Sequence, residues 1–193
     1  MRLLALLFLL PLAGCPKDGK VQTGGDNFAF PEYADLECAE GLRHGGAPPP
    51  VGTEIFCVRE AVGSPQRHGT AIRYYPTGEI AARGTYAGDR QVGEWTVWYR
   101  DGSLKRKESW VNGVQDGLWA EFHPGGTRRA QGPMLDGVRS SLWTFYDEDG
   151  NRYLEGQYLA GQENDIWREF APDGTAVRER LYRQGRLLRQ SEL

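Results

Sequence analysis

Apolar and aromatic residues recur along this chain with a fixed step of 24 residues, without insertion or deletion from Gly69 to Gly185. Three columns carry the pattern: Trp95, Trp119, Trp143 and Trp167; Tyr74, Trp98, Phe122, Tyr146 and Phe170; and Tyr86, Trp110, Met134, Tyr158 and Tyr182. Self-similarity at such a period is typical of stacked repeats, in which each unit buries its apolar side chains against its neighbours. The pattern predicts five 24-residue repeats over residues 69–187.

Each repeat, called a unit below, has the pattern of a β-hairpin. In the second unit, residues 94–99 are rich in β-branched and aromatic side chains, and Asp101-Gly102, another strand-like run and Asn112-Gly113 follow. Strand-like runs separated by such dipeptides are a strong hairpin signal. Glycine occupies the first turn of every unit, because a tight turn needs a positive φ; these are Gly78, Gly102, Gly126, Gly150 and Gly174. The sequence therefore predicts an all-β fold, an elongated single-layer antiparallel sheet of consecutive β-hairpins.

Aromatic residues nine positions apart flank each connection between units, as Tyr86 and Trp95 do, and so do Trp110 and Trp119. We expect the two members of each pair to lie directly opposite each other, so that the rings form a ladder along the sheet. Trp95 and Trp98 are three apart and would point to opposite faces of a regular strand. Either both faces are partly covered or a bulge near Thr96 returns both rings to one face. Charged residues two positions after the later tryptophans favour the bulge, and Pro133 should weaken strand pairing locally.

The first 14 residues have the pattern of an export signal, with Arg2 followed by an apolar stretch over residues 3–12. Ten helical residues cover ~15 Å against a hydrocarbon thickness of ~30 Å, so the stretch predicts a cleaved signal peptide over residues 1–14. The closing Leu12-Ala13-Gly14-Cys15 resembles the lipobox of bacterial lipoproteins, although an ordinary signal with an incidental cysteine is the alternative. The resemblance implies that Cys15 is lipidated and anchors the protein to a membrane of the cell envelope.

Residues 15–30 are interpreted as the lipidated cysteine and a flexible tether, because the stretch from Pro16 to about Asn27 is polar, contains glycine and has no periodicity. Pro16 stands where inner-membrane lipoproteins of well-studied Gram-negative envelopes carry aspartate, which favours the outer membrane. The two remaining cysteines, Cys38 and Cys57, permit one disulfide in an oxidising compartment. They enclose a loop-like segment, and residues 53–58 have strand character. We expect a disulfide-stabilised N-terminal cap over residues 31–68 and a C-terminal tail over residues 188–193.

Composition and charge reduce the number of function classes that fit this chain. The formal net charge is -3 and basic clusters alternate with acidic residues, which argues against a nucleic-acid partner. The first interpretation of the basic clusters is a solvated surface of mixed charge. The second is that the arginine-rich C-terminus binds anionic lipid headgroups. None of the three histidines, His44, His68 and His123, has further ligands at metal-site spacing, and His123 stands where the second unit has Tyr99. We find no phosphate-binding loop and no activated nucleophile, so the sequence predicts a protein that is not an enzyme, with no catalytic residue, metal site or cofactor.

The string from Gly93-Glu94-Trp95 to Asn112-Gly113 resembles the bacterial variant of the MORN repeat, in sequences often classed as YwqK-type antitoxins. The resemblance implies a single-layer sheet that binds other proteins, or in some relatives lipid. We expect a lipid-anchored, non-catalytic protein-interaction scaffold whose protein partner is unknown. A glycan- or peptidoglycan-binding module with rings stacked on sugars, and an antitoxin-like neutralising protein, are the alternatives.

Overall fold

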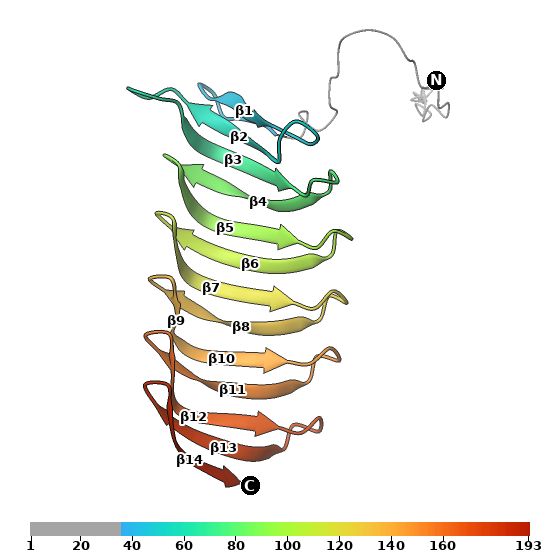
Figure 1. The fold of residues 1–193 in the computed structure, drawn as a ribbon, viewed down its shortest axis with the longest axis vertical. Helices are drawn as coiled ribbons and strands as arrows, with labels where there is room; N and C mark the ends of the chain where they lie inside the picture. The colour runs from blue at the N-terminus through green and yellow to red at the C-terminus, as the bar shows by residue number, and fades with distance from the viewer. Residues whose placement is uncertain (1–35) are drawn as a thin grey trace, which may run out of the picture. The chain divides into compact units, whose positions relative to one another are not determined.

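The computed structural model describes residues 36–193. The predicted signal peptide, Cys15 and the tether lie outside the described residues. Residues 36–193 form one antiparallel sheet of fourteen strands, in which consecutive strands pair along the sequence (Figure 1). Within this part of the chain, no helix has the length and hydropathy that a membrane span requires. The structure confirms the predicted all-β sheet of consecutive hairpins.

The strands fall into a cap hairpin, five hairpin units and a final strand. The cap hairpin consists of β1 (Arg43–Ala47) and β2 (Glu54–Arg59). The first three units are β3 (Gln66–Tyr74) with β4 (Ile80–Ala87), β5 (Arg90–Trp98) with β6 (Leu104–Val111), and β7 (Val114–Phe122) with β8 (Arg128–Leu135). The last two are β9 (Val138–Arg139) and β10 (Ser141–Tyr146) with β11 (Arg152–Leu159), and β12 (Gln162–Phe170) with β13 (Ala176–Arg183). β14 (Arg186–Glu192) ends the sheet and contains most of the expected tail.

Two kinds of turn alternate along the sheet. The turns within units carry the recurring glycine at a φ between 81° and 105°, and in the second unit the Gly102 amide donates to the Tyr99 carbonyl at 3.1 Å. The turns between units have two central residues that both have positive φ, such as Asn112 at 50° and Gly113 at 84°. This geometry matches the twist of the flanking strands. Each turn between units also bonds the start of the strand that follows the previous turn. The Gly113 amide, for example, donates to the Gln91 carbonyl of β5 at 2.9 Å, so these turns stack in a row.

The expectation that aromatic residues nine apart lie directly opposite each other is wrong. Tyr86 pairs with Gln91, because β5 has two extra residues, Gly93 and Glu94, between its pairings with β4. Gly93 has a φ of 68°, and the corresponding residues of the other units also have positive φ: Gly69, Gly117, Ser141 and Asp165. The rings still meet diagonally, with centroids 5.1 Å apart for Tyr86 and Trp95 and 5.0 Å apart for Tyr158 and Trp167.

The bulge expected near Thr96 is also wrong, because Trp95 and Trp98 lie on opposite faces of the sheet. Trp95 packs with Ala71, Ala82 and Tyr86, and Val97 joins the same cluster. Trp98 instead lines a hollow together with Glu94 and Thr96. Tyr74, of the same column as Trp98, packs in a different cluster with Ile55 and Ile72. Both faces are therefore partly covered, and we call them the tryptophan face, which bears Trp95, and the opposite face.

Pro133 interrupts pairing where the sequence predicts it. The Ser140 amide donates to the Pro133 carbonyl at 3.1 Å, but proline has no N–H to return a second bond. The strand that follows breaks at Ser140 into β9 and β10, whereas β12 of the next unit is continuous. The proline therefore costs one ladder contact without ending the sheet.

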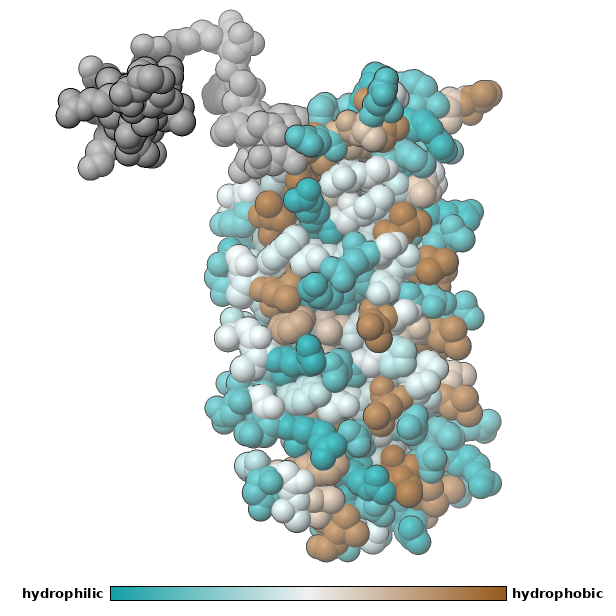
Figure 2. All heavy atoms as spheres, turned by 180° about the vertical axis from the view of Figure 1, so that it is seen from behind, coloured by the Kyte–Doolittle hydropathy of each residue, from teal (hydrophilic) through white to brown (hydrophobic). Residues whose placement is uncertain are grey.

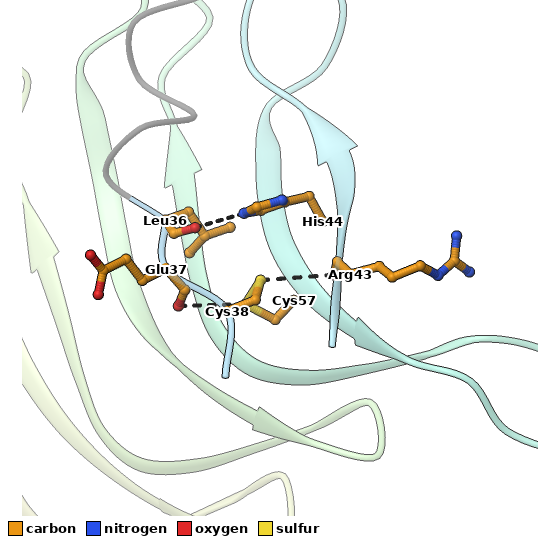
Figure 3. The surroundings of a disulfide bond; sticks show 6 residues. All are labelled: Leu36, Glu37, Cys38, Arg43, His44 and Cys57. Atoms are coloured by element: carbon orange, nitrogen blue, oxygen red, sulfur yellow. Dashed lines mark hydrogen bonds between the residues drawn. A yellow bond between two sulfur atoms is a disulfide. The ribbon is translucent and has the colours of Figure 1, made fainter. Parts of the chain in front are cut away.

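A disulfide joins Cys38 and Cys57, with the two Cα atoms 5.5 Å apart (Figure 3). The segment that leads into β1 lies over the opposite face, where Leu36 is fully buried against Ile55 and Ile72. The His44 ring donates from Nε2 to the Leu36 carbonyl at 2.7 Å. The cap thus covers the opposite face at the β2–β3 end of the sheet, and the disulfide holds the covering segment in place.

Candidate functional site

The tryptophan column forms the core of the tryptophan face. Trp95, Trp143 and Trp167 are 1%, 1% and 3% exposed. Each ring lies over a glycine of the preceding unit: Gly84, Gly132 and Gly156, respectively. A Cβ atom on Gly84 would come within 2.1 Å of the Trp95 ring, so no other residue fits there without a shift. The sequence prediction missed this glycine column, although its members stand 48 and 24 residues apart and could have been found.

The third unit departs from this arrangement because its Trp119 pairs with Glu108 of the second unit, at the position where the other three tryptophans meet glycine. The Glu108 carboxylate is buried, lies 2.7 Å from the Arg106 Nε as an ion pair and accepts from the Trp110 Nε1 at 3.0 Å. Trp119 is only half-buried, and its ring centroid lies 5.2 Å from that of Trp143. Three of the six tryptophans predicted to form the ladder are half-buried rather than buried: Trp98, Trp110 and Trp119.

A second column ties successive units together at the other hairpin ends, and the sequence analysis noted two of its members, Tyr99 and His123, without their hydrogen bonds. The Tyr75 hydroxyl donates to the Trp98 carbonyl at 2.8 Å, and the Tyr99 hydroxyl donates to the Phe122 carbonyl at 2.9 Å. His123 makes the same contact through Nε2 with the Tyr146 carbonyl, at 3.0 Å. His123 therefore replaces Tyr99 in role as well as in position, and it is a structural residue.

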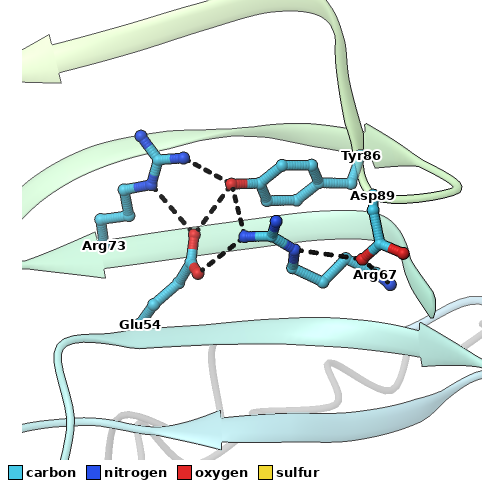
Figure 4. Close-up of polar contacts among 5 residues, drawn as sticks. All are labelled: Glu54, Arg67, Arg73, Tyr86 and Asp89. Atoms are coloured by element: carbon cyan, nitrogen blue, oxygen red, sulfur yellow. Dashed lines mark hydrogen bonds and ion pairs between the residues drawn. The ribbon is translucent and has the colours of Figure 1, made fainter. Parts of the chain in front are cut away.

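A polar cluster on the tryptophan face joins the cap to the first unit and to the turn that follows it (Figure 4). Glu54 accepts hydrogen bonds from Arg73, Arg67 and Tyr86 at 3.0, 3.3 and 3.1 Å, and Arg67 also contacts Asp89 at 3.3 Å. Burial raises the pKa of the Tyr86 phenol. The hydrogen bond from Arg73 acts in the other direction but does not cancel this effect. Although burial opposes it, hydrogen bonds to Glu54 and Tyr86 raise the pKa of the Arg73 guanidinium. The charges are paired within the cluster, which indicates a structural tie.

The opposite face has an open apolar hollow near the middle of the sheet, with a volume of about 490 Å³. Its apolar lining comes from Leu118, Ala120, Pro133 and Leu142, and Glu94, Lys107, Arg128 and Gln131 contribute polar groups. Leu118 is 77% exposed and Leu142 is 45% exposed. Each follows the positive-φ residue of its unit, so that the bulge carries the leucine away from the packed core. Apolar surface of this kind, with polar groups around it, is typical of an interaction site.

A second apolar surface follows the row of turns between units. We call it the turn row, and its residues are 42–57% exposed: Val111, Val114, Leu135, Val138 and Leu159. Successive turns contact each other, since Val138 lies against Gly161 of the next turn. Figure 2 shows hydrophobic residues recurring along this edge of the sheet.

Residues 36–193 contain no group of three histidine, cysteine, aspartate or glutamate side chains that could hold a metal ion. An open sheet of stacked hairpins with apolar hollows defines a β-hairpin repeat protein whose surfaces are suited to binding.

Comparison with known families then specifies the repeat. The model of the MORN repeat variant family matches residues 67–87 and 91–112, which are the first two hairpin units. The repeats of this chain are thus of the MORN variant type where they match, and such modules are generally non-catalytic protein-interaction scaffolds. No curated protein matches the chain.

Twenty chains of solved structures match this one. Among them, the crystal structure of the GtfA/B complex bound to UDP and GlcNAc is 13% identical over 83% of this chain, with a TM-score of 0.28. This chain spans 26% of the length of that one. A TM-score this low supports neither a shared architecture nor a shared function.

Proposed function

We propose that this protein is a lipid-anchored scaffold of the bacterial cell envelope that binds another protein on the opposite face of its sheet. The observation that carries the proposal is the apolar hollow at Leu118 and Leu142, exposed on a sheet whose first two units match the MORN repeat variant. The cap supplies a precedent within the chain. There, a segment with a buried leucine, Leu36, lies across the same face. The expected occupant of the hollow is a similar apolar segment of a partner.

The anchor part of the proposal rests on Leu12-Ala13-Gly14-Cys15 at the end of an apolar stretch. Acylation at Cys15 and a tether would present the sheet from a membrane of the envelope, by the resemblance the outer one. Replacement of Cys15 by serine is expected to abolish incorporation of radiolabelled palmitate in growing cells. Labelling that persists in the Cys15→Ser protein would remove the anchor from the proposal and leave the binding surface standing.

The binding surface is tested by photocrosslinking in intact cells, with a photoreactive phenylalanine derivative in place of Leu118. We expect one crosslinked protein, lost when Leu142→Asp places a charge in the hollow. The matched control is Leu187→Asp in β14, because Leu187 is 47% exposed and Leu142 is 45% exposed. Absence of any crosslinked protein, or equal loss in both aspartate variants, would contradict the proposed surface.

Glycan binding is the less favoured candidate. Stacking on a sugar needs an open ring face. Three of the six tryptophans, Trp95, Trp143 and Trp167, are nearly fully buried, and the other three are half-buried. Antitoxin-like neutralisation is one form of protein binding, and the crosslinked partner would identify it.

A further inference from the structure

Arg139 on the tryptophan face is a guanidinium framed by aromatic rings. Its Cζ atom lies 4.4 Å from the ring centroid of Trp143, 5.4 Å from that of Tyr158 and 5.6 Å from that of Phe145. Its Nη1 donates to the Tyr158 hydroxyl at 3.0 Å. Aromatic faces attract a cation and restrict its movement. Arg139 as a whole is half-buried, so the residue keeps contact with solvent.

Arg67 occupies the equivalent place in the first unit, because 139 minus 67 is 72, three steps of 24 residues. Its Nη1 also donates to a tyrosine hydroxyl 19 residues later, that of Tyr86, at 3.1 Å. Its Cζ lies 4.3 Å from the Tyr86 ring centroid. Arg67 differs from Arg139 in having two carboxylate partners, Glu54 and Asp89, each at 3.3 Å.

Both carboxylate positions hold other residues around Arg139. Glu54 pairs in register with Arg73, and the corresponding pair three units later is Ala130 with Phe145. Asp89 corresponds to Gly161, since the Asp89 amide bonds the Arg67 carbonyl just as the Gly161 amide bonds the Arg139 carbonyl. Arg139 therefore keeps the aromatic frame and the tyrosine of the first unit. It makes no ion pair with any residue between 36 and 193.

We propose that Arg139 and Tyr158 bind a carboxylate of the protein partner, an aspartate or glutamate side chain that supplies the negative charge supplied by Glu54 and Asp89 in the first unit. A guanidinium presents its donors in a planar fork that matches a carboxylate, and its pre-organised geometry reduces the entropy lost on binding. The inference rests on the proposed scaffold function, and it specifies the partner as acidic at this contact. It uses the tryptophan face, away from the hollow.

The test is a titration of the full chain, labelled with ¹⁵N in its arginine and tryptophan side chains, with a hexaglutamate peptide and with hexaglutamine. We expect the Arg139 Nε–H resonance to move and saturate with hexaglutamate only. Arg67 should not move, because Glu54 and Asp89 already occupy its donors. Arg183, which is exposed and outside any aromatic frame, reports non-specific attraction to the polyanion. The proposal is overturned if Arg139 moves no more than Arg183, or moves equally with hexaglutamine.

Two variants separate binding from packing. Arg139→Met keeps an apolar side chain over Trp143 and removes the charge, so the Trp143 indole resonance should no longer respond to hexaglutamate. Glu54→Ala should make Arg67 responsive. If either variant fails to fold, the wild-type titration still decides the question. If a partner crosslinks at Leu118 but Arg139 does not respond to hexaglutamate, this site is refuted and the scaffold function stands. If Arg139 responds but no partner crosslinks, the scaffold function is refuted.

Discussion

Glycine at positions 84, 132 and 156 determines where a tryptophan ring can lie on the neighbouring strand. The ring takes the volume that a Cβ atom would need. Its indole N–H then donates to a backbone carbonyl of the strand that carries the glycine, as Trp95 does to Thr85 at 3.2 Å. Where Glu108 replaces the glycine, Trp119 is less buried. Glycine at this position thus accompanies a buried indole, and glutamate accompanies a half-buried one.

Replacement of Gly156 by alanine should destabilise the protein, because the new Cβ would lie 2.1 Å from the Trp167 ring. Overpacking of this kind costs ~1–3 kcal/mol of unfolding free energy, measurable by urea denaturation. Gly125→Ala is the matched control, since a Cβ there meets nothing within 4 Å. Equal midpoints for the two variants would show that the ring can move aside without cost.

At the scale of the element, one hairpin is too small to bury its own rings, and the contacts that stabilise it come from its neighbours. The Tyr99 hydroxyl bonds the next unit, the turns between units bond each other, and Trp143 contacts both Trp119 and Tyr158. The cap hairpin differs because β1 has a neighbour on one side only. The covalent link from Cys38 to Cys57 stabilises this end of the sheet.

Reduction of the disulfide should weaken the cap more than the rest of the sheet. Closing a loop between cysteines 19 apart in sequence contributes about 3 kcal/mol in the chain-entropy account. We expect faster amide exchange in β2 and β3 after reduction, with β11 to β13 unchanged, by hydrogen-exchange mass spectrometry. The Cys38→Ser/Cys57→Ser variant should exchange like the reduced protein and ignore reductant. Uniform exchange along the sheet after reduction would contradict a local role.

The whole sheet behaves as a linear array, because each unit contacts the units before and after it. The stability of such an array is approximately a sum of unit and interface contributions. The period of 24 residues is uniform from Gly69 to Gly185, so each interface has the same backbone register. Units are therefore interchangeable as long as the step is kept.

Removal of residues 93–116 should leave a folded, shorter sheet, because Gly117 then takes the place of Gly93. Trp119 would lie over Gly84 instead of Glu108 and should become as buried as Trp95. We expect cooperative unfolding, a β-type circular dichroism spectrum and reduced iodide quenching of tryptophan fluorescence. Removal of residues 93–104, half a unit, is the control and should abolish cooperative unfolding. A misfolded 24-residue deletion would show that the units are not equivalent.

The regular part of the fold could be predicted because its signals are local. Asp101-Gly102 and Asn112-Gly113 each specify a turn within a few residues, and the 24-residue step repeats that information five times. Pro133 is equally local, since its missing donor acts where it stands. Hairpins, turns and the unit length thus follow from short stretches of chain that need no knowledge of their neighbours.

Register and exposure depend on contacts between strands, and the amino-acid order alone left them open. The bulge at Gly93 shifts Tyr86 away from Trp95, and the corresponding bulges at Gly117 and Ser141 expose Leu118 and Leu142. The hollow and the Arg139 frame, both candidate binding sites, exist only after several strands have paired. Backbone turn chemistry therefore determined the repeating hairpins, whereas long-range strand pairing decided which side chains are buried and which are presented to a partner.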